Sequence, residues 1–337
     1  MSAHALDQKR EDSRPGWASL IASELDMVER ELAMAVFSDV PAAAGLCGRL
    51  ISAGGKRVRP ALVILSALGV DPGAAVERIA NLGAAVELVH SASLVHDDVV
   101  DETRERRGVA SANAQWGNKI SVLGGDFLLA RSFSLLANDG DPLVIQILAS
   151  TAVRMAESEM LQVSAEGDIS LWEANYWRII RDKTANFMGA CCAVGAVAAA
   201  ASPPVRQVLS QYGEQLGMAF QITDDLLDIA GDPALTGKSV GSDLTHGKFT
   251  LPVLLALQNL GDQGRQRLRD LLDKGMLSRA EACEAAGMVL ECGAIDLARQ
   301  SASSYAQKAR ELLRVLPEGR YRNALADLTM FVINRQA

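Results

Sequence analysis

Apolar residues recur every three or four positions along most of the chain after about Pro15, and alternation in steps of two is almost absent. A spacing of three and four places side chains on one face of an α-helix, whereas a spacing of two is typical of strands. The pattern therefore predicts amphipathic helices throughout. Strands are expected to be absent or very short.

Clusters of glycine, proline and aspartate interrupt this pattern and divide it into segments of helix length. They lie at Gly54-Gly55, Asp71-Pro72-Gly73, Asn138 to Pro142, Ser202-Pro203-Pro204, Gly231-Asp232-Pro233, Leu260-Gly261-Asp262 and Pro317-Glu318-Gly319. The fold predicted from these breaks is an all-α multi-helix bundle. The longest apolar run, residues 187–201, is shorter than the roughly 20 residues that cross a bilayer, so we expect a buried helix and no transmembrane segment.

Two stretches of helical spacing carry aspartates in the same pattern. Asp97, Asp98 and Asp101 form the first triplet, and Asp224, Asp225 and Asp228 form the second. Like charges four residues apart destabilise a bare helix, so a positive group is expected between them. Magnesium commonly joins one or two carboxylates to the phosphates of a substrate. Two such helices facing each other would form a magnesium-diphosphate clamp.

The two triplets lie in different halves of the chain and make chemical sense only if they share a cavity. We therefore predict one domain over residues 16–337, built around a central cavity, after a flexible N-terminal segment at residues 1–15. No low-complexity tract and no longer repeat is apparent in the sequence.

Composition narrows the class of protein. The chain has 337 residues, of which 49% are hydrophobic and 22% charged, so it can bury a large core. Its formal net charge of −8 gives no general attraction to nucleic acid or anionic lipid. Nucleic acid is therefore not expected as a partner, and any phosphate must be held by local basic clusters.

The five cysteines show neither zinc spacing nor a paired framework, and the first ten residues lack the apolar core of a signal peptide. A reducing, cytoplasmic environment is predicted.

Basic residues near each triplet are candidates for binding phosphate. Gly54 to Pro60 places Lys56, Arg57 and Arg59 on a glycine-led turn, where backbone can approach an anion closely. Arg106 and Arg107 follow the first triplet, and paired guanidinium groups can each serve a different diphosphate. A solvated charged loop is the alternative for each of these runs.

Three further elements accompany the triplets. His90 shares a helical stripe with Asp97 and Asp101. Lys183-Thr184 lies inside a helical segment, and a glycine-spaced loop with Lys238 and Lys248 follows the second triplet. A surface lysine and a plain connecting loop remain the alternatives.

Taken together, these motifs resemble the trans-isoprenyl diphosphate synthases, the polyprenyl synthetase family, from about residue 40 to the end. The matching segments are Gly-Gly-Lys-Arg-Val-Arg-Pro at 54–60, Leu-Val-His-Asp-Asp-Val-Val-Asp at 94–101 with Arg106-Arg107-Gly108, Lys183-Thr184-Ala185, Phe-Gln-Ile-Thr-Asp-Asp-Leu-Leu-Asp at 220–228, and residues 237–252. The segments from 91 to 98 and from 117 to 128 are most similar to the long-chain, octaprenyl- and decaprenyl-type synthases.

The resemblance implies an all-helical fold, a homodimer, and magnesium-dependent head-to-tail condensation of isopentenyl diphosphate with an allylic diphosphate. By position, Lys56, Arg59, His90 and Arg107 would bind isopentenyl diphosphate. The allylic diphosphate would be held by Arg106, Lys183, Thr184, Gln221, Lys238 and Lys248. Asp97, Asp101 and Asp224, supported by Asp98, Asp225 and Asp228, would bind magnesium, with three ions expected.

Product length is expected to depend on the side chains one turn before Asp97, which are Ala92 and Ser93. A helix rises about 5.4 Å per turn, roughly one extended isoprene unit, so small residues here let the growing chain continue along the helix. We predict a product of about thirty to fifty carbons. Phe127, Leu128 and Phe133 are candidates for a deeper floor of this pocket, although ordinary core packing is the more common fate of such residues.

Three alternatives remain at this stage. A geranylgeranyl diphosphate synthase would differ only in product length. A terpene cyclase or head-to-head condensing enzyme would not need the basic turn at 54–60. A non-catalytic partner subunit of a heteromeric synthase could have lost the metal- and phosphate-binding residues, and none is missing here.

Overall fold

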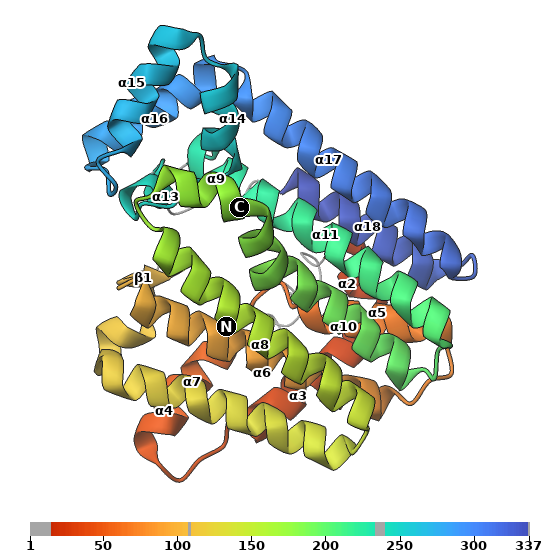
Figure 1. The fold of residues 1–337 in the computed structure, drawn as a ribbon. Coiled ribbons are helices and arrows are strands. Elements are labelled where there is room, and N and C mark those ends of the chain that lie inside the picture. The colour runs from red at the N-terminus through yellow and green to blue at the C-terminus, as the bar shows by residue number, and fades with distance from the viewer. Residues whose placement is uncertain (1–14, 107–108, 233–239, 336–337) are drawn as a thin grey trace, which may run out of the picture. The chain divides into compact units, whose positions relative to one another are not determined.

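The computed structural model describes residues 15–106, 109–232 and 240–335, and nearly all of its elements are helices (Figure 1). The first half contains α2 (Gly16–Leu20), α3 (Ala22–Ala35), α4 (Pro41–Ser52), α5 (Val58–Val70), α6 (Val76–Val100), α7 (Ala112–Asp139) and α8 (Pro142–Ala165). Two short antiparallel strands, β1 (Glu105–Arg106) and β2 (Val109–Ala110), lie between α6 and α7.

The second half begins with α9 (Ile169–Ile180), the π-helical turn η1 (Arg181–Ala185), α10 (Asn186–Ala198) and α11 (Pro203–Ala230). It continues with α13 (Ser242–Thr245), α14 (Leu251–Asn259), α15 (Asp262–Leu272), α16 (Arg279–Glu291), α17 (Ala294–Leu312), the 3₁₀ turn η2 (Leu313–Val315) and α18 (Arg320–Asn334). The all-α prediction is confirmed, and the strands are trivial as expected. The predicted flexible segment at 1–15 lies outside the described residues except for Pro15.

The predicted breaks fall between helices. Gly54-Gly55 separates α4 from α5, Asp71-Pro72-Gly73 separates α5 from α6, and Gly140 ends α7 in a left-handed conformation with a φ of 71°. Glycine adopts this conformation without steric cost, and proline begins the helix that follows, as at Pro142 and Pro203.

The chain divides into two compact units. Unit 1 contains the described residues of Met1–Ala149, Ala190–Ser210 and Leu312–Leu328. Unit 2 contains those of Ser150–Gly189, Gln211–Glu311 and Thr329–Ala337. The expectation of one domain with a shared cavity stays a prediction.

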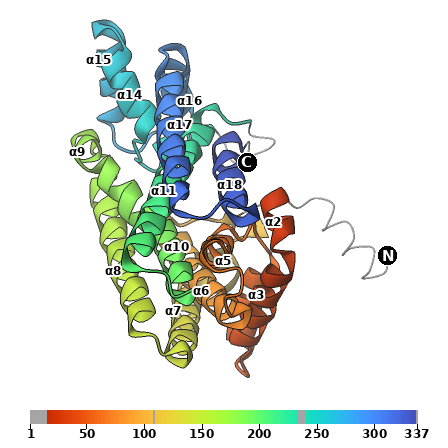
Figure 2. The same cartoon turned by 90° about the vertical axis from the view of Figure 1, so that its right-hand side faces the viewer.

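Within unit 1, α6 packs against α7, α5 and α3 (Figures 1 and 2). The run Val58–Leu68 of α5 is buried at nearly every position, which explains why its sequence is apolar all round rather than striped. Gly195 of α10 lies so close to α5 that a Cβ atom there would collide with the carbonyl oxygen of Val63. Helix α10, whose first residues belong to unit 2, is buried along most of the predicted apolar run, with Phe187 and Cys191 inaccessible, so the prediction of a buried helix is confirmed.

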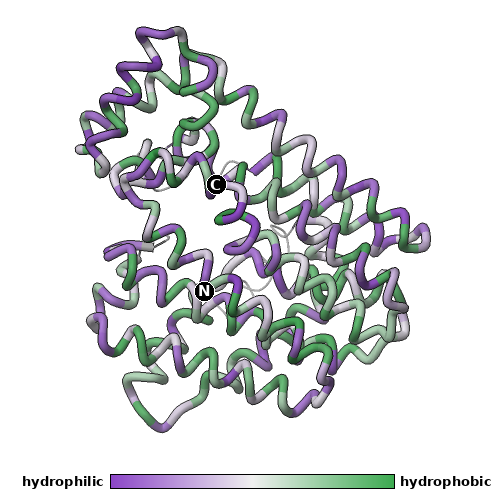
Figure 3. The backbone as a smooth tube through the Cα atoms, viewed as in Figure 1, coloured by the Kyte–Doolittle hydropathy of each residue, from purple (hydrophilic) through white to green (hydrophobic). Residues whose placement is uncertain are grey.

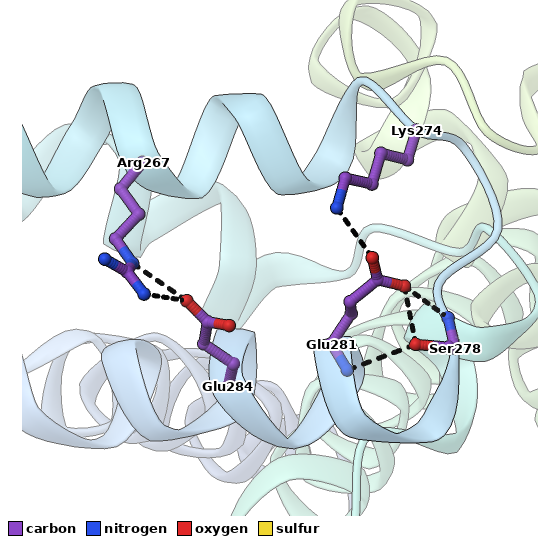
Figure 4. Close-up of polar contacts among 5 residues, drawn as sticks. All are labelled: Arg267, Lys274, Ser278, Glu281 and Glu284. Atoms are coloured by element: carbon purple, nitrogen blue, oxygen red, sulfur yellow. Dashed lines mark hydrogen bonds and ion pairs between the residues drawn. The ribbon is translucent and has the colours of Figure 1, made fainter.

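Within unit 2, helices α14, α15 and α16 pack on one another, and Figure 3 shows hydrophilic positions along the outer surface of α15. Leu268, Leu271 and Leu272 form the buried stripe of that helix. The joint between α15 and α16 is held by surface polar contacts (Figure 4). Ser278 and Glu281 form a capping box at the start of α16, and Lys274 contacts Glu281 at 2.6 Å.

Helix α7 is the one helix in the described part of the chain that is long and apolar enough to cross a membrane, judged by length and composition. A core helix of a soluble protein passes the same test. Here α7 packs along α6 and bends at Gly117, where φ is 77°. Val122, Leu123 and Phe133 are exposed on it.

Candidate functional site

The first aspartate triplet lies at the C-terminal end of α6. Asp97 and Asp98 belong to its last turn, and Asp101 is the C-cap residue. Asp98 is only 1% exposed, whereas Asp97 and Asp101 are half-buried. The C-terminal end of a helix carries the negative pole of its dipole, which disfavours anions. Three carboxyl groups at this end are therefore an unfavourable arrangement unless a cation joins them.

The chain after the first triplet turns back onto the end of α6. The backbone amide of Thr103 and the side-chain amide of Asn113 both donate to the carbonyl oxygen of Asp98, at 3.0 and 2.8 Å. Ser111 accepts from the amide of Ala114 and begins α7. Arg106 belongs to β1 of this hairpin and pairs with Val109 of β2, while Arg107 lies outside the described residues.

The basic turn at 54–60 is also part of unit 1. Gly54 has a φ of 71°, Lys56 is exposed, and Arg59 is half-buried in the first turn of α5. The sequence suggested a cluster of three cations here. One of them, Arg57, is instead turned inward and pairs with Glu29 and Glu87. His90, half-buried on α6, belongs to the same unit as Lys56 and Arg59.

The second triplet lies in the last two turns of α11, again at the negative end of a helix. Asp225 is buried and accepts hydrogen bonds from the Tyr176 hydroxyl at 2.6 Å and from the Gln221 amide at 3.1 Å. Gln221 in turn accepts from the Thr184 hydroxyl at 2.9 Å. These bonds join three predicted site residues, Thr184, Gln221 and Asp225, into one connected network.

Burial raises the pKa of Asp225 to about 7, and the negative charges of Asp243 and Asp224 act in the same direction. The hydrogen bonds from Tyr176 and Gln221 oppose the shift but do not cancel it. A carboxyl group in this setting is short of positive charge, which is the condition that a nearby cation would relieve.

Lys183 lies on the π-helical turn η1 between α9 and α10. Its Nζ is 2.5 Å from Glu159 Oε2 and 3.3 Å from Gln162 Oε1, both on α8. A π turn widens a helix locally and is frequent at functional sites. The sequence indicated only a continuous helix at this point, because no simple residue pattern distinguishes a π turn from an α turn.

Asp224 has a partner that the sequence did not suggest. Arg335, at the end of α18, contacts Asp224 Oδ1 at 2.6 Å. Its guanidinium group lies 3.8 Å from the centroid of the Phe220 ring and donates to the Phe220 carbonyl at 2.8 Å. Arg335 therefore supplies a positive charge to the second triplet. No local signal could have found it, because the pairing depends on how α18 packs on α11.

Asp228 and the glycine-spaced loop are linked through the backbone. The amide of Asp243 donates to Asp228 Oδ2 at 3.2 Å, and the amide of Gly241 donates to the Asp228 carbonyl at 2.9 Å. Lys248 follows in the same loop, and its amide donates to the carbonyl of Asp243. Gly247 has a φ of 67° and approaches Gly167 so closely that no side chain would fit. Lys238 lies outside the described residues.

The residues predicted to control product length lie in different environments. Ala92 is buried on α6, and Ser93 donates to the carbonyl of His90 at 2.8 Å. Leu128 is fully buried, while Arg131 stacks on the ring of Phe127 at 5.0 Å. Phe133 is 51% exposed. A side chain so exposed could limit a growing product only where another surface covers it.

Among residues 15–106, 109–232 and 240–335, no group of three or more histidine, cysteine, aspartate or glutamate residues lies close enough to hold a metal ion alone. The triplets nevertheless fit a hard divalent cation, because their oxygen donors sit at the negative ends of helices and such ions are completed by substrate phosphates and water. All five cysteines are free thiols.

An all-helical protein with an aspartate triplet at the end of each of two helices matches a known class of enzyme. A model of the polyprenyl synthetase family matches residues 41–289. The chain belongs to this family, as the motifs predicted.

Relatives and solved structures extend this result. The octaprenyl diphosphate synthase of Haemophilus influenzae is 36% identical over 315 residues, which are 93% of this chain and 94% of the relative. The short chain isoprenyl diphosphate synthase of Methanothermobacter thermautotrophicus is also 36% identical, over 293 residues, 85% of this chain and 88% of the relative. Both relatives are prenyl diphosphate synthases, and such enzymes are transferases.

The crystal structure of a polyprenyl synthase from Caulobacter crescentus, complexed with calcium and isoprenyl diphosphate, superposes with a TM-score of 0.90. That protein is 36% identical, and the match covers 95% of this chain and 97% of the other. The isoprenoid synthase type of all-α fold is thereby confirmed.

Proposed function

We propose that this protein is a magnesium-dependent trans-prenyltransferase that condenses isopentenyl diphosphate with an allylic diphosphate and repeats the reaction to give a long-chain polyprenyl diphosphate. The observation that carries the proposal is the network in unit 2 through which Thr184, Gln221 and Asp225 are hydrogen-bonded to one another. Family membership and the divalent cation and isoprenyl diphosphate in the Caulobacter crescentus structure support it.

In this proposal the two triplets share one central cavity in a single domain over residues 16–337. Asp97, Asp101 and Asp224 would hold magnesium, as three ions, with Asp98, Asp225 and Asp228 in support. The positions of both triplets at helix C-terminal ends support this assignment, because the negative end of a helix dipole disfavours carboxylates and favours a bound cation.

Two sets of basic and polar residues would bind the substrates. Isopentenyl diphosphate would be held by Lys56, Arg59, His90 and Arg107. The allylic diphosphate would be held by Arg106, Lys183, Thr184, Gln221, Lys238 and Lys248. Lys183 is already held by Glu159 and Gln162, so its ammonium group is oriented before any ligand arrives.

The chemistry follows from these charges. Bound magnesium would neutralise the diphosphate as it leaves the allylic substrate. Lysine and arginine side chains add to this neutralisation, and water has to be kept out because it would trap the allylic cation. The alkene of isopentenyl diphosphate attacks that cation, and loss of a proton regenerates an allylic diphosphate one isoprene unit longer. The diphosphate itself is the proposed proton acceptor.

Small side chains at Ala92 and Ser93 favour a product of about thirty to fifty carbons, because one helical turn corresponds to about one isoprene unit. The relative from Methanothermobacter thermautotrophicus, at equal identity, supports the second candidate, a short-chain or geranylgeranyl diphosphate synthase. Ala92→Phe should shorten the product by at least one unit, and an unchanged product distribution would contradict the assigned pocket.

A cytoplasmic homodimer completes the proposal. The exposed surface of α7 that carries Val122, Leu123 and Phe133 is the surface that a second copy would cover in this proposal. Covering it would also place Phe133 against the partner, where it could line the product pocket. Size measurement in solution and Phe133→Ala product analysis test these two statements separately.

The decisive experiment is a reaction of the purified chain with magnesium, isopentenyl diphosphate and farnesyl diphosphate, followed by mass spectrometry of the products. Long-chain products that require both isopentenyl diphosphate and magnesium support the proposal. Products formed without isopentenyl diphosphate would indicate a cyclase, and inactivity of the chain alone would favour a partner subunit. A repeat with a geranylgeranyl primer defines the preferred substrate.

A further inference from the structure

Arg57 occupies the centre of the basic turn but does not behave as a ligand-binding cation. It is only 9% exposed, and its backbone is left-handed, with φ 48° and ψ 37°. A residue with a side chain adopts this conformation rarely and at a cost, so the surroundings must hold it there. The contacts of its guanidinium group explain how.

Four hydrogen bonds fix the Arg57 guanidinium. Nε and Nη2 donate to the two carboxylate oxygens of Glu29 at 2.6 and 3.1 Å. Nη1 donates to Glu87 Oε1 at 2.8 Å, and Nη2 also donates to the carbonyl of Ile51 at 2.9 Å. One side chain thus connects α3, the end of α4 and α6. Its charge is matched by two carboxylates, so it has none to offer to a diphosphate.

Residues proposed to bind isopentenyl diphosphate lie next to Arg57 and close to its partner Glu87 in the sequence. Lys56 and Arg59 flank Arg57 in the turn, and His90 follows Glu87 by three positions on α6. Residues three apart on a helix share a face. The Arg57–Glu87 pair therefore sets the position of the turn relative to the helix face that carries His90.

We infer that Arg57 is a positioning residue, whose ion pairs with Glu29 and Glu87 hold Lys56, Arg59 and His90 in the geometry that binds the diphosphate of the non-allylic substrate. This inference rests on the proposed function and adds to it. Lys56 and Arg59 lie in a turn whose left-handed backbone at Arg57 is held in place by the contacts of the Arg57 guanidinium. Loss of the guanidinium lets the turn relax and weakens one subsite selectively.

The test uses the full chain with magnesium and compares two steady-state constants. Arg57→Gly relieves the left-handed backbone, and combining it with Glu87→Gln removes the buried charge that would otherwise be left without a partner. The double variant should raise the KM for isopentenyl diphosphate ten- to a hundredfold, since outer supporting groups typically contribute in this range. The KM for farnesyl diphosphate should change less than threefold.

Arg57→Lys should give an intermediate rise, because one ammonium group cannot make four bonds to three separate partners. Arg78 supplies a matched control in the same unit, since it forms a similar network with Asp139 and Asp141. Arg78→Lys should lower the melting temperature and leave both KM values unchanged. Calorimetric binding of isopentenyl diphosphate to each variant gives a readout independent of turnover.

Two outcomes would overturn the inference. One is a double variant whose KM and affinity for isopentenyl diphosphate stay within twofold of the parent, and the other is an equal rise in both KM values. If the double variant does not fold, the Arg57→Lys comparison with Arg78→Lys decides in the same way. A parent chain without any reaction dependent on isopentenyl diphosphate would instead reject the proposed function, so the two failures are distinguishable.

Discussion

Two carboxyl groups of unit 2 respond to their surroundings in opposite directions. Asp225 is buried near the C-terminal end of α11, and burial raises its pKa to about 7. Glu281 lies in the first turn of α16, where the hydrogen bond from Lys274, followed by those from Ser278, lowers its pKa to about 2 (Figure 4). One carboxyl is placed where a negative charge is disfavoured, the other where it is favoured.

The opposite pKa shifts distinguish a carboxyl group that stabilises the fold, Glu281, from one that belongs to the proposed metal site, Asp225. Glu281 satisfies the backbone at a helix N-terminus, the positive end of the dipole, and so contributes to folding. Asp225 sits at the negative end of a helix among other acids, which lowers stability unless a cation is bound. A protein that keeps such an arrangement pairs it with a ligand, here proposed to be magnesium with a diphosphate.

Removing one carboxylate at the end of α11 and one at the start of α16 gives the strongest test of this contrast. Asp224→Asn should lower kcat by about two to three orders of magnitude, because a proposed ligand of the magnesium that stabilises the departing diphosphate is lost. Glu281→Gln should change kcat less than twofold, since Glu281 belongs to the capping box of α16 and not to the proposed metal site. Steady-state kinetics at saturating magnesium measure both. An Asp224→Asn variant that keeps more than a tenth of the parent kcat would contradict the role of Asp224 in the proposed metal site.

A smaller effect is expected at the hydroxyl that supports Asp225. Tyr176→Phe removes the 2.6 Å hydrogen bond and leaves a buried carboxyl less satisfied. The free energy of unfolding should fall by about 1–3 kcal/mol, measured by urea denaturation without magnesium. The double variant Tyr176→Phe/Asp225→Asn should recover part of this loss. Additive effects of the two changes would show that the pair is not coupled.

Ser278→Ala tests the contribution of the capping box of α16 to stability. The substitution removes the side-chain acceptor of the capping box, so the first turn of α16 loses a partner for its backbone. A decrease of about 1 kcal/mol in the free energy of unfolding is expected. Ser134→Ala, at an exposed mid-helix hydroxyl of α7, is a suitable control and should have a smaller effect.

The smallest expected effect is a pH dependence at Glu281. Its pKa is lowered from 4.5 to about 2 on folding, so its ionised form contributes stability above about pH 4.5, and this contribution is lost as the pH falls toward 2. Glu281→Gln should therefore have a lower melting temperature than the parent at pH 6, and the difference should shrink steadily between pH 4.5 and 2. A difference that stays constant down to pH 2 would contradict the assignment.

Local signals in the sequence predicted the helices and several of the breaks between them. Proline and glycine act within a few residues of themselves, so breaks such as Asp71-Pro72-Gly73 are where the structure has them. The paired aspartate triplets and the basic turn identified the family for the same reason, since each motif is a short stretch of neighbouring residues.

Which polar groups turn inward could not be read in this way. Asp224 and Asp225 are adjacent, yet one is partly exposed and the other buried, because neighbouring residues on a helix point about 100° apart. Arg57 looked like the third cation of a phosphate-binding turn, but Glu29 and Glu87 draw it inward. The π turn at Lys183 is likewise invisible in residue spacing.

Residue order along the chain was thus sufficient for helix content, several of the helix breaks and the chemistry of the motifs, because these depend on contacts between near neighbours. The pairing of Arg335 with Asp224, of Tyr176 with Asp225 and of Arg57 with Glu87 depended on packing between helices that are distant in sequence. Such pairs form when burial of apolar faces brings the helices together, and the polar groups between them must then find partners.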